Sequence, residues 1–276
     1  MRLRALLATL FLLVACVSCG ADRVSKDDPL PTRARDGDHL TIGVRFDAPG
    51  LAQRTLDGTL AGFDVDVATY IAHELGVDPG HITWHETTPA RRETDLTSGT
   101  VDLVVATYSI TDKRKQQVSF AGPYFVTGQD LLVRLTSPDI TGPGSLNGKR
   151  LCSVTGTTSA QMVKDKFAQA VQLVEYPRYP DCVTALLSNQ VDAITTDAAI
   201  LAGYAAQNPE LLKVIGRPFS TERYGVGLRK GDTEGQHAVD DAIRKMVSSG
   251  AWEKSLENTI GQSNYPLPNP PEITEQ

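Results

Sequence analysis

The chain has 276 residues, with 33 acidic and 27 basic side chains, a formal net charge of −6 and 41% hydrophobic residues. This composition is ordinary for a globular protein, and the acidic balance argues against a nucleic-acid-binding surface. Beyond the N-terminal region, no apolar run is long enough to cross a bilayer.

The N-terminus is similar to a bacterial lipoprotein leader. Arg2 and Arg4 are followed by an apolar stretch, residues 5–15, that is too short to span a membrane, and Leu-Val-Ala directly precedes Cys16. We expect residues 1–15 to be a lipoprotein signal peptide and Cys16 to carry a diacylglycerol, with Cys19 as the alternative lipidation site. An ordinary secretory signal is the other alternative. The chain is therefore expected to lie outside the cytoplasm, anchored to the outer face of the cell membrane.

Two further segments lack an apolar period. Residues 16–38 are charged and contain Pro, which predicts a disordered tether, and residues 263–276 predict a disordered, Pro-rich tail. Residues 39–262, between them, exceed one typical domain of about 100–150 residues. A stretch of this length is expected to form two lobes.

Strands and helices alternate along residues 39–133, which predicts a mainly parallel sheet flanked by helices. The predicted strands are residues 40–45, 82–86 and 101–106, and the predicted helices are residues 63–75 and 89–98. A strand beginning at Leu131 is expected to be the first crossing between the lobes. Asp64 and Asp66 begin the first of these helices, where we expect capping and no ligand contact.

The second lobe repeats the scheme. The predicted strands are residues 150–155, 171–176 and 193–196, and the predicted helices are residues 160–170, 181–188 and 197–204. A return crossing near residues 219–223 precedes a strand and two helices that rejoin the first lobe. The predicted lobes are residues 39–131 plus 222–262 for lobe 1 and residues 132–221 for lobe 2. Two crossings of this kind form a hinge.

The most specific signal lies between Val101 and Arg134, VDLVVATYSITDKRKQQVSFAGPYFVTGQDLLVR. A buried apolar run is followed by a hydroxyl-rich turn and then by Arg114, whose planar guanidinium suits a carboxylate. The segment closely resembles the core motif of the amino-acid-binding proteins of ABC importers, solute-binding family 3, and GFDVDV at residues 62–67 is a second hallmark. The resemblance implies an α/β fold of the two-lobed, periplasmic-binding-protein type II class. It also implies a monomer that has neither cofactor nor metal and that binds L-glutamate or L-aspartate for ABC permease subunits.

The resemblance also implies roles for individual residues. Arg114 matches the Arg that binds the ligand's α-carboxylate, and Ser109 and the main chain of Thr107 match its supporting groups. Asp197 matches the carboxylate that accepts the α-ammonium group. Because Arg114 and Asp197 come from different lobes, the zwitterion would bridge them and favour hinge closure.

The turn before the helix at residue 160 is the expected contribution of lobe 2 to the carboxylate site. Thr157 and Thr158 lie there, beside main-chain N–H groups at a helix N-terminus. Helix capping is the alternative role for both Thr158 and Asp197. Tyr124 is expected to pack in the core rather than to line the pocket.

Specificity is expected to depend on two further basic residues. Arg45 and Arg92 align with positions that are basic in the family's glutamate and aspartate binders, so the resemblance implies contacts with a side-chain carboxylate. Either side chain could instead point to solvent, and Arg91 could exchange roles with Arg92. Arg178 and Tyr179 are additional candidates for reaching the ligand's side chain.

Cys152 and Cys182 lie in well-patterned segments of a chain that its leader sends to an oxidising compartment, and we predict a disulfide between them. Neither has a CxxC or His partner at metal-ligand spacing, and two unpaired buried thiols are the alternative. The resemblance also favours the disulfide, because the family's glutamate-binding branch carries a Cys pair in the corresponding segments.

Enzymatic function is not expected, because the chain has no GxSxG elbow, no P-loop and no metal-ligand cluster. A cyclohexadienyl-dehydratase-like enzyme on the same fold is the strongest alternative. A ligand sensor for a membrane kinase is another. Capture and delivery of an acidic amino acid, glutamate before aspartate, is the function that the sequence favours.

Overall fold

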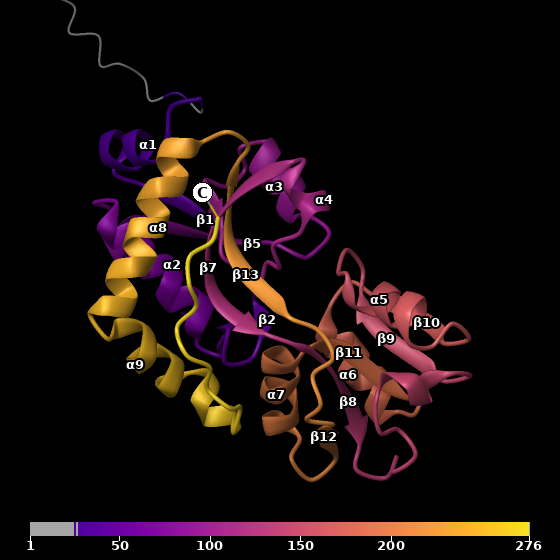
Figure 1. Cartoon of the computed structure of the whole chain (residues 1–276). Helices are drawn as coiled ribbons and strands as arrows, with labels where there is room; N and C mark the ends of the chain where they lie inside the picture. The colour runs from indigo at the N-terminus through magenta and orange to yellow at the C-terminus, as the bar shows by residue number, and fades with distance from the viewer. Residues whose placement is uncertain (1–24, 26, 276) are drawn as a thin grey trace, which may run out of the picture.

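The computed structural model describes residue 25 and residues 27–275, which form two α/β lobes joined by two crossing segments (Figure 1). The sheet of lobe 1 has the strand order β5-β1-β6-β13-β7, and the sheet of lobe 2 has the order β10-β9-β11-β8-β12. In each sheet, one strand runs against the other four: β13 in lobe 1 and β8 in lobe 2. These reversed strands are the ones that the chain enters after each crossing. The predicted fold class, with mainly parallel sheets, is confirmed.

The elements of lobe 1 come from both ends of the described chain. They are α1 (Leu30–Gly37), β1 (Leu40–Val44), β2 (Asp47–Ala48), β3 (Ala52–Arg54), β4 (Leu60–Ala61), α2 (Phe63–Glu74), η1 (Pro79–His81), β5 (Ile82–Glu86), α3 (Arg92–Thr97), β6 (Leu103–Val104), α4 (Asp112–Lys115), β7 (Val118–Thr127), β13 (Glu222–Arg229), α8 (Thr233–Ser248), α9 (Ala251–Asn258) and η3 (Ile260–Ser263).

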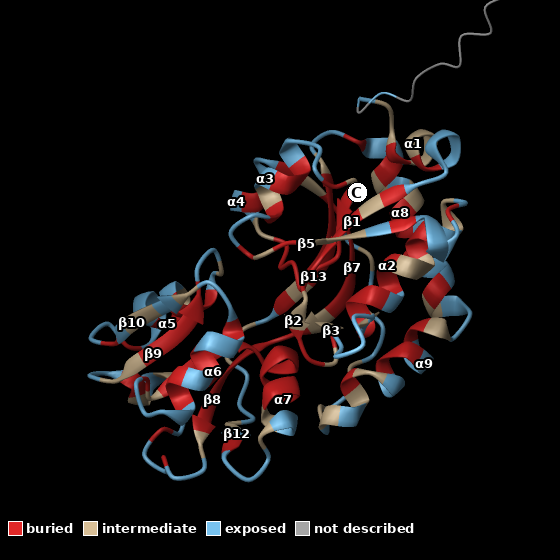
Figure 2. Ribbon diagram, turned by 180° about the vertical axis from the view of Figure 1, so that it is seen from behind, coloured by how far each residue is buried: buried red, intermediate tan, exposed pale blue. Residues whose placement is uncertain are grey.

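Lobe 2 is built from one continuous stretch of chain. Its elements are β8 (Gln129–Arg134), η2 (Pro143–Leu146), β9 (Arg150–Val154), α5 (Ser159–Lys166), β10 (Gln172–Tyr176), α6 (Tyr179–Leu187), β11 (Ala193–Asp197), α7 (Ala198–Gln207) and β12 (Leu212–Val214). Helices cover both faces of each sheet, so the central strands are buried (Figure 2).

The centre of lobe 1 explains why the predicted strand at residues 101–106 is so apolar. β6 lies between β1 and β13, and Val101 and residues 103–106 are all buried. A strand covered on both faces reads as a continuous hydrophobic run rather than as an alternation. Residues that follow such a strand at its carboxyl end are placed at the cleft edge of the sheet.

β7 was absent from the predicted elements. Gly122 and Pro123 interrupt its sequence, and Pro is rare inside sheets because it cannot donate a ladder hydrogen bond. β7 accommodates Pro123 because it is the edge strand of the lobe 1 sheet. The chain therefore first crosses between Thr127 and Gln129, a few residues before the boundary predicted at 131/132.

Part of the predicted tether is helical, so that prediction was wrong for its last residues. Leu30 and Ala34 of α1 are buried, and the Leu30 main-chain N–H donates to Asp232 at the start of α8. These two apolar side chains, four residues apart, form one face of a short helix, which the charged composition of the segment obscured. Residues 1–24, which include the predicted signal peptide, Cys16 and Cys19, lie outside the described residues.

The C-terminal tail also packs on lobe 1, which corrects the prediction of disorder. Tyr265 is hydrogen-bonded to Thr127 through their hydroxyl groups, 2.7 Å apart, and the main-chain N–H of Glu275 donates to the Gly122 carbonyl. The Glu275 carboxylate is buried against Lys115. Aromatic, backbone and charged contacts at separated points hold a segment that has no regular secondary structure of its own.

Cys152 of β9 and Cys182 of α6 form the predicted disulfide, with both residues completely buried. The bond joins a sheet strand to the helix that packs on it, across 30 positions of sequence. A cross-link that closes a loop of this length reduces the entropy of the unfolded chain.

We expect the double variant Cys152→Ala, Cys182→Ala to lower the free energy of unfolding by about 3–4 kcal/mol, the entropic value for such a loop. Urea unfolding followed by circular dichroism measures the difference. Because the alanines also remove packed sulfur atoms, the wild type in reducing buffer isolates the effect of the cross-link. Equal unfolding midpoints for oxidised and reduced wild type would contradict the expectation.

Candidate functional site

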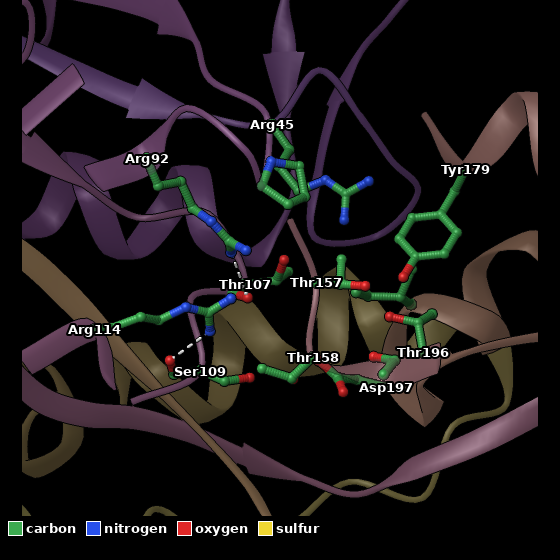
Figure 3. Close-up of a pocket in the computed structure, with 13 residues that line it drawn as sticks. Arg45, Arg92, Thr107, Ser109, Arg114, Thr157, Thr158, Tyr179, Thr196 and Asp197 are labelled. Atoms are coloured by element: carbon green, nitrogen blue, oxygen red, sulfur yellow. Dashed lines mark hydrogen bonds between the residues drawn. The ribbon is translucent and has the colours of Figure 1, made fainter. Parts of the chain in front are cut away.

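A narrow pocket lies between the two lobes (Figure 3). Eight of its lining residues are those predicted from the sequence: Arg45, Arg92, Thr107, Ser109, Arg114, Thr157, Thr158 and Asp197. Tyr179, an additional candidate from the sequence, also lines the pocket, and the other four lining residues are Pro89, Ser159, Thr196 and Ile200.

Arg114 is held at the pocket by contacts from both lobes. It lies on α4, where the Thr111 hydroxyl accepts the Arg114 main-chain N–H and caps this short helix. Its guanidinium donates to the carbonyl oxygens of Ser109 at 2.7 Å and of Gly156, across the cleft, at 3.3 Å. Nε lies 3.3 Å from the Glu93 carboxylate. Arg114 is only 7% exposed, so it is not a solvated surface residue.

The backbone of Thr107 has an uncommon conformation that two charged residues maintain. Its φ of 47° lies in the left-handed region, which is costly for a branched side chain. The Thr107 main-chain N–H donates to the Asp64 carboxylate at 2.8 Å, and the Thr107 carbonyl accepts from Arg92 at 3.0 Å. Tyr124, completely buried as predicted, donates to the other Asp64 oxygen at 2.8 Å. Asp64 thus shapes the pocket without lining it.

Arg45 lies at the carboxyl end of β1 and is also buried. Its Nε and Nη2 atoms donate to one oxygen of the Asp47 carboxylate at 2.9 and 2.7 Å. Its guanidinium carbon lies 5.2 Å from the centre of the Tyr179 ring, which belongs to lobe 2. Arg45 therefore already has a counter-ion and an aromatic neighbour inside the protein.

Arg92 is the least compensated cation of the pocket. It donates to the carbonyls of Ala106 and Thr107 at 2.9 and 3.0 Å, and its Nε has no hydrogen-bond partner among the described residues. Burial, and then the nearby charge of Arg114, lower the pKa of Arg92 to about 9. An anion in the pocket would oppose both effects.

Asp197 provides a carboxylate on the opposite wall. It ends β11, and its side chain makes no capping hydrogen bond to α7. Instead, the Tyr224 hydroxyl, which belongs to lobe 1, donates to it at 2.6 Å. Burial, followed by the charge of Glu222, raises the pKa of Asp197 to about 7. A cationic group placed beside Asp197 would favour its ionised form.

The turn before α5 brings small polar groups to the same cavity. Thr158 occupies the N-cap position but its side chain makes no capping hydrogen bond, while the Thr157 hydroxyl donates to the Val154 carbonyl at 2.8 Å. Thr157, Thr158 and Ser159 of this turn therefore line a cavity that is also lined by Arg114 (Figure 3).

Of the remaining candidates, Tyr179 lines the pocket, whereas Arg91 and Arg178 do not. Arg91 is largely exposed and pairs with Asp95, so it does not exchange roles with Arg92. Arg178 lies outside this pocket, in an ion pair with Glu86 of lobe 1. Tyr179 does line the pocket, and its hydroxyl has no hydrogen-bond partner among the described residues.

The sequence did not identify Asp64 and Tyr224, which hold pocket residues in place without lining the pocket themselves. Asp64 belongs to the GFDVDV hallmark, but its helical position suggested only capping. Tyr224 lies in a strand that was predicted, but no local pattern indicates which buried tyrosine reaches across the hinge. The signal that could have found Asp64 is a charged residue within the otherwise apolar, buried face of α2.

A two-lobed α/β protein that encloses a charged pocket at its hinge is built to bind a small polar molecule. Residues 40–262 match the family model of the bacterial extracellular solute-binding proteins, family 3. The chain belongs to this family.

The protein relatives agree with this assignment. The chain is 42% identical over 241 residues to the glutamate-binding protein GluB of Corynebacterium efficiens, covering 84% of this chain and 82% of that protein. It is 35% identical over 260 residues to the ABC transporter glutamine-binding protein GlnH of Bacillus subtilis, covering 92% and 94%. These relatives are named as binding proteins, which confirms the prediction that the chain is not an enzyme and supports its place in the glutamate-binding branch.

Solved structures show the same fold. An ancestral arginine-binding protein bound to glutamine superposes with a TM-score of 0.76 at 34% identity, covering 81% of this chain and 98% of that protein. The L-cysteine solute receptor of Neisseria gonorrhoeae superposes with a TM-score of 0.78 at 27% identity, covering 87% and 98%.

Within residues 27–275, no helix has the length and apolar character needed to cross a membrane. Within the same part of the chain, no group of three or more His, Cys, Asp or Glu side chains is arranged to hold a metal ion.

We expect Asp197→Asn to stabilise the ligand-free protein at neutral pH. Because the pKa of Asp197 is raised by folding, its contribution to stability is complete below the unfolded value of about 4 and is lost as the pH rises to about 7. The variant should therefore gain over wild type between pH 4 and pH 7, by more than about 1 kcal/mol, and keep this gain at pH 8. Urea unfolding at pH 4.5, 6 and 8 measures the difference. A gain that is independent of pH would contradict the assignment.

Proposed function

We propose that the protein captures L-glutamate, and L-aspartate less tightly, by closing its two lobes around the amino acid. The observation that supports this proposal most strongly is the convergence of three arginines and one aspartate on a single pocket between the lobes. Such a set of charges suits a ligand that carries two carboxylates and one ammonium group.

The α-amino and α-carboxylate groups of the ligand would bridge the cleft. Arg114 and the N–H groups beside Thr158 would bind the α-carboxylate, and Asp197 would accept the ammonium group. Arg114 belongs to lobe 1, whereas Thr158 and Asp197 belong to lobe 2. Full binding therefore requires the closed arrangement, so the ligand stabilises closure through contacts that the open form cannot make.

The charge balance of the pocket supports an acidic side chain. Asp47 pairs with Arg45 and Glu93 with Arg114, which leaves Arg92 as the guanidinium that has no carboxylate partner among the described residues. The hydrogen bonds of Arg92 go only to the carbonyls of Ala106 and Thr107. The side-chain carboxylate of glutamate would give Arg92 an anionic partner, whereas the neutral amide of glutamine would leave its positive charge unpaired.

Delivery to an ABC importer is the second part of the proposal. The similar protein of Bacillus subtilis is named as an ABC transporter binding protein, and the family is extracellular. We propose that Cys16 carries the lipid that holds the protein at the outer face of the membrane, where permease subunits would receive the closed form. No catalytic step is required, because the ligand is released unchanged.

Isothermal titration calorimetry against glutamate, aspartate, glutamine and asparagine tests the ligand directly. We expect glutamate to bind most tightly, and Arg92→Met to raise the Kd for glutamate by about 100-fold, since a lost partner of a buried charge costs about 2–5 kcal/mol. The Kd for glutamine should rise by less than about tenfold. Arg91→Gln, the exposed neighbour, is the matched control. Equal losses for both ligands would reject Arg92 as the group that recognises the side chain.

Glutamate binding should weaken as the pH falls. The ligand's ammonium group requires ionised Asp197, whose pKa is about 7 in the empty pocket, while both ligand carboxylates remain ionised above pH 5.5. The Kd should rise by about tenfold or more between pH 8 and pH 5.5. In Asp197→Asn, binding should be weak and nearly independent of pH. A wild-type Kd that stays constant over this range would contradict the role of Asp197.

A further inference from the structure

The Asp47–Pro49 segment of lobe 1 rests directly on α7 of lobe 2, outside the ligand pocket. It contains β2, which lies beside α7 and α6 (Figure 1). Gly203 and Tyr204 of α7 contact this segment, and neither lines the ligand pocket. The contact joins the lobes on the side where Arg45 enters the cavity.

Gly203 leaves space for the opposing chain. A Cβ atom at this position would overlap the Pro49 carbonyl oxygen and would lie 3.1 Å from the Pro49 Cβ atom, so its nearest neighbours all belong to the other lobe. The backbone of Gly203 is helical and does not need the conformational freedom of glycine. A glycine inside a helix costs about 0.5–1 kcal/mol relative to alanine. Close approach of Pro49 is the physical reason for a glycine here.

Tyr204 extends this contact toward the pocket. Its hydroxyl donates to the Asp47 carbonyl oxygen, and the Asp47 carboxylate binds the Arg45 guanidinium at 2.9 and 2.7 Å. Arg45 also lies over the ring of Tyr179, so its side chain is held between Asp47 of its own lobe and Tyr179 of the other. Figure 3 shows Arg45 and Tyr179 at the pocket. An uninterrupted series of contacts therefore runs from α7 to a guanidinium inside the cavity.

We propose that Gly203 and Tyr204 are positioning residues that form a seat for the Asp47–Pro49 segment. The seat is occupied only when the lobes are closed, and occupying it fixes Asp47 and, through Asp47, the Arg45 guanidinium. Closure and the placement of Arg45 are thereby coupled. The inference rests on the proposed function, because it assigns the seat a role in binding an acidic amino acid.

The variant Gly203→Ala separates this role from a general structural one. The added methyl group would prevent Pro49 of lobe 1 from approaching α7 of lobe 2 fully. We therefore expect the Kd for L-glutamate to rise by tenfold or more, mainly through faster dissociation. The unfolding midpoint of the ligand-free variant should equal or exceed that of wild type, since alanine favours the helix. A merely structural glycine would give lower stability together with weaker binding.

Two further variants sharpen the test. Ala205→Gly also changes helix propensity in α7 but makes no seat contact, so it should lower the unfolding midpoint and leave the Kd for glutamate unchanged. Tyr204→Phe removes only the hydroxyl and should weaken glutamate more than glutamine, because its effect passes through Arg45. An unchanged glutamate Kd in Gly203→Ala, or an equal loss in Ala205→Gly, would overturn the proposal.

A measurement of closure that needs no ligand distinguishes failure of the seat from failure of the proposed function. Glu86 of lobe 1 and Arg178 of lobe 2 form an ion pair, so Glu86→Cys with Arg178→Cys allows a short bismaleimide to cross-link closed molecules. Peptide mass spectrometry quantifies that cross-link among all products. Adding Gly203→Ala should slow its formation several-fold, whereas adding Ala205→Gly should not. If wild type binds neither glutamate nor glutamine, the proposed function fails, and the cross-linking rates alone decide about the seat.

Discussion

The burial of three guanidinium groups in one small pocket is the constraint on which the rest of the site depends. Removing such groups from water costs several kcal/mol each unless partners are supplied. Asp47 is the partner of Arg45, and main-chain carbonyls and Glu93 are the partners of Arg114. Arg92 contacts main-chain carbonyls and the ring of Tyr108 but pairs with no carboxylate of the described residues. The empty pocket therefore contains positive charge that is not fully paired. An incoming anion pairs with the arginines and so stabilises the closed arrangement of the two lobes.

The buried acidic residues around the pocket also cost stability when they are charged. Asp64 and Asp197 are buried with pKa values raised to about 6 and about 7, so each lowers the stability of the empty protein when it is ionised. Asp64 maintains the left-handed Thr107 turn, and Asp197 is aimed by Tyr224 from the other lobe. Stability is given up here for a preorganised binding surface, a compromise that is common at functional sites.

The sequence predicts the repeated strand and helix order, the disulfide and the residues that gather in the pocket, because these follow from local patterns and from a long family motif. It does not predict β7, whose Pro123 is tolerated only because tertiary structure makes β7 an edge strand. It also misses α1 and the packed tail, since both are stabilised by contacts with distant residues such as Asp232 and Thr127. The sequence does not identify Asp64 and Tyr224 for the same reason, because the residues that they contact are distant in sequence.

The N-terminal end of the described chain is attached to lobe 1, because α1 packs against α8 and β1. The C-terminal end differs: residues 260–266 border α7 of lobe 2 before the tail continues along lobe 1 to Lys115. A mechanical load applied through the N-terminal end would thus be borne by lobe 1. Lobe 2 can then change its position relative to lobe 1 while the N-terminal end is held in place.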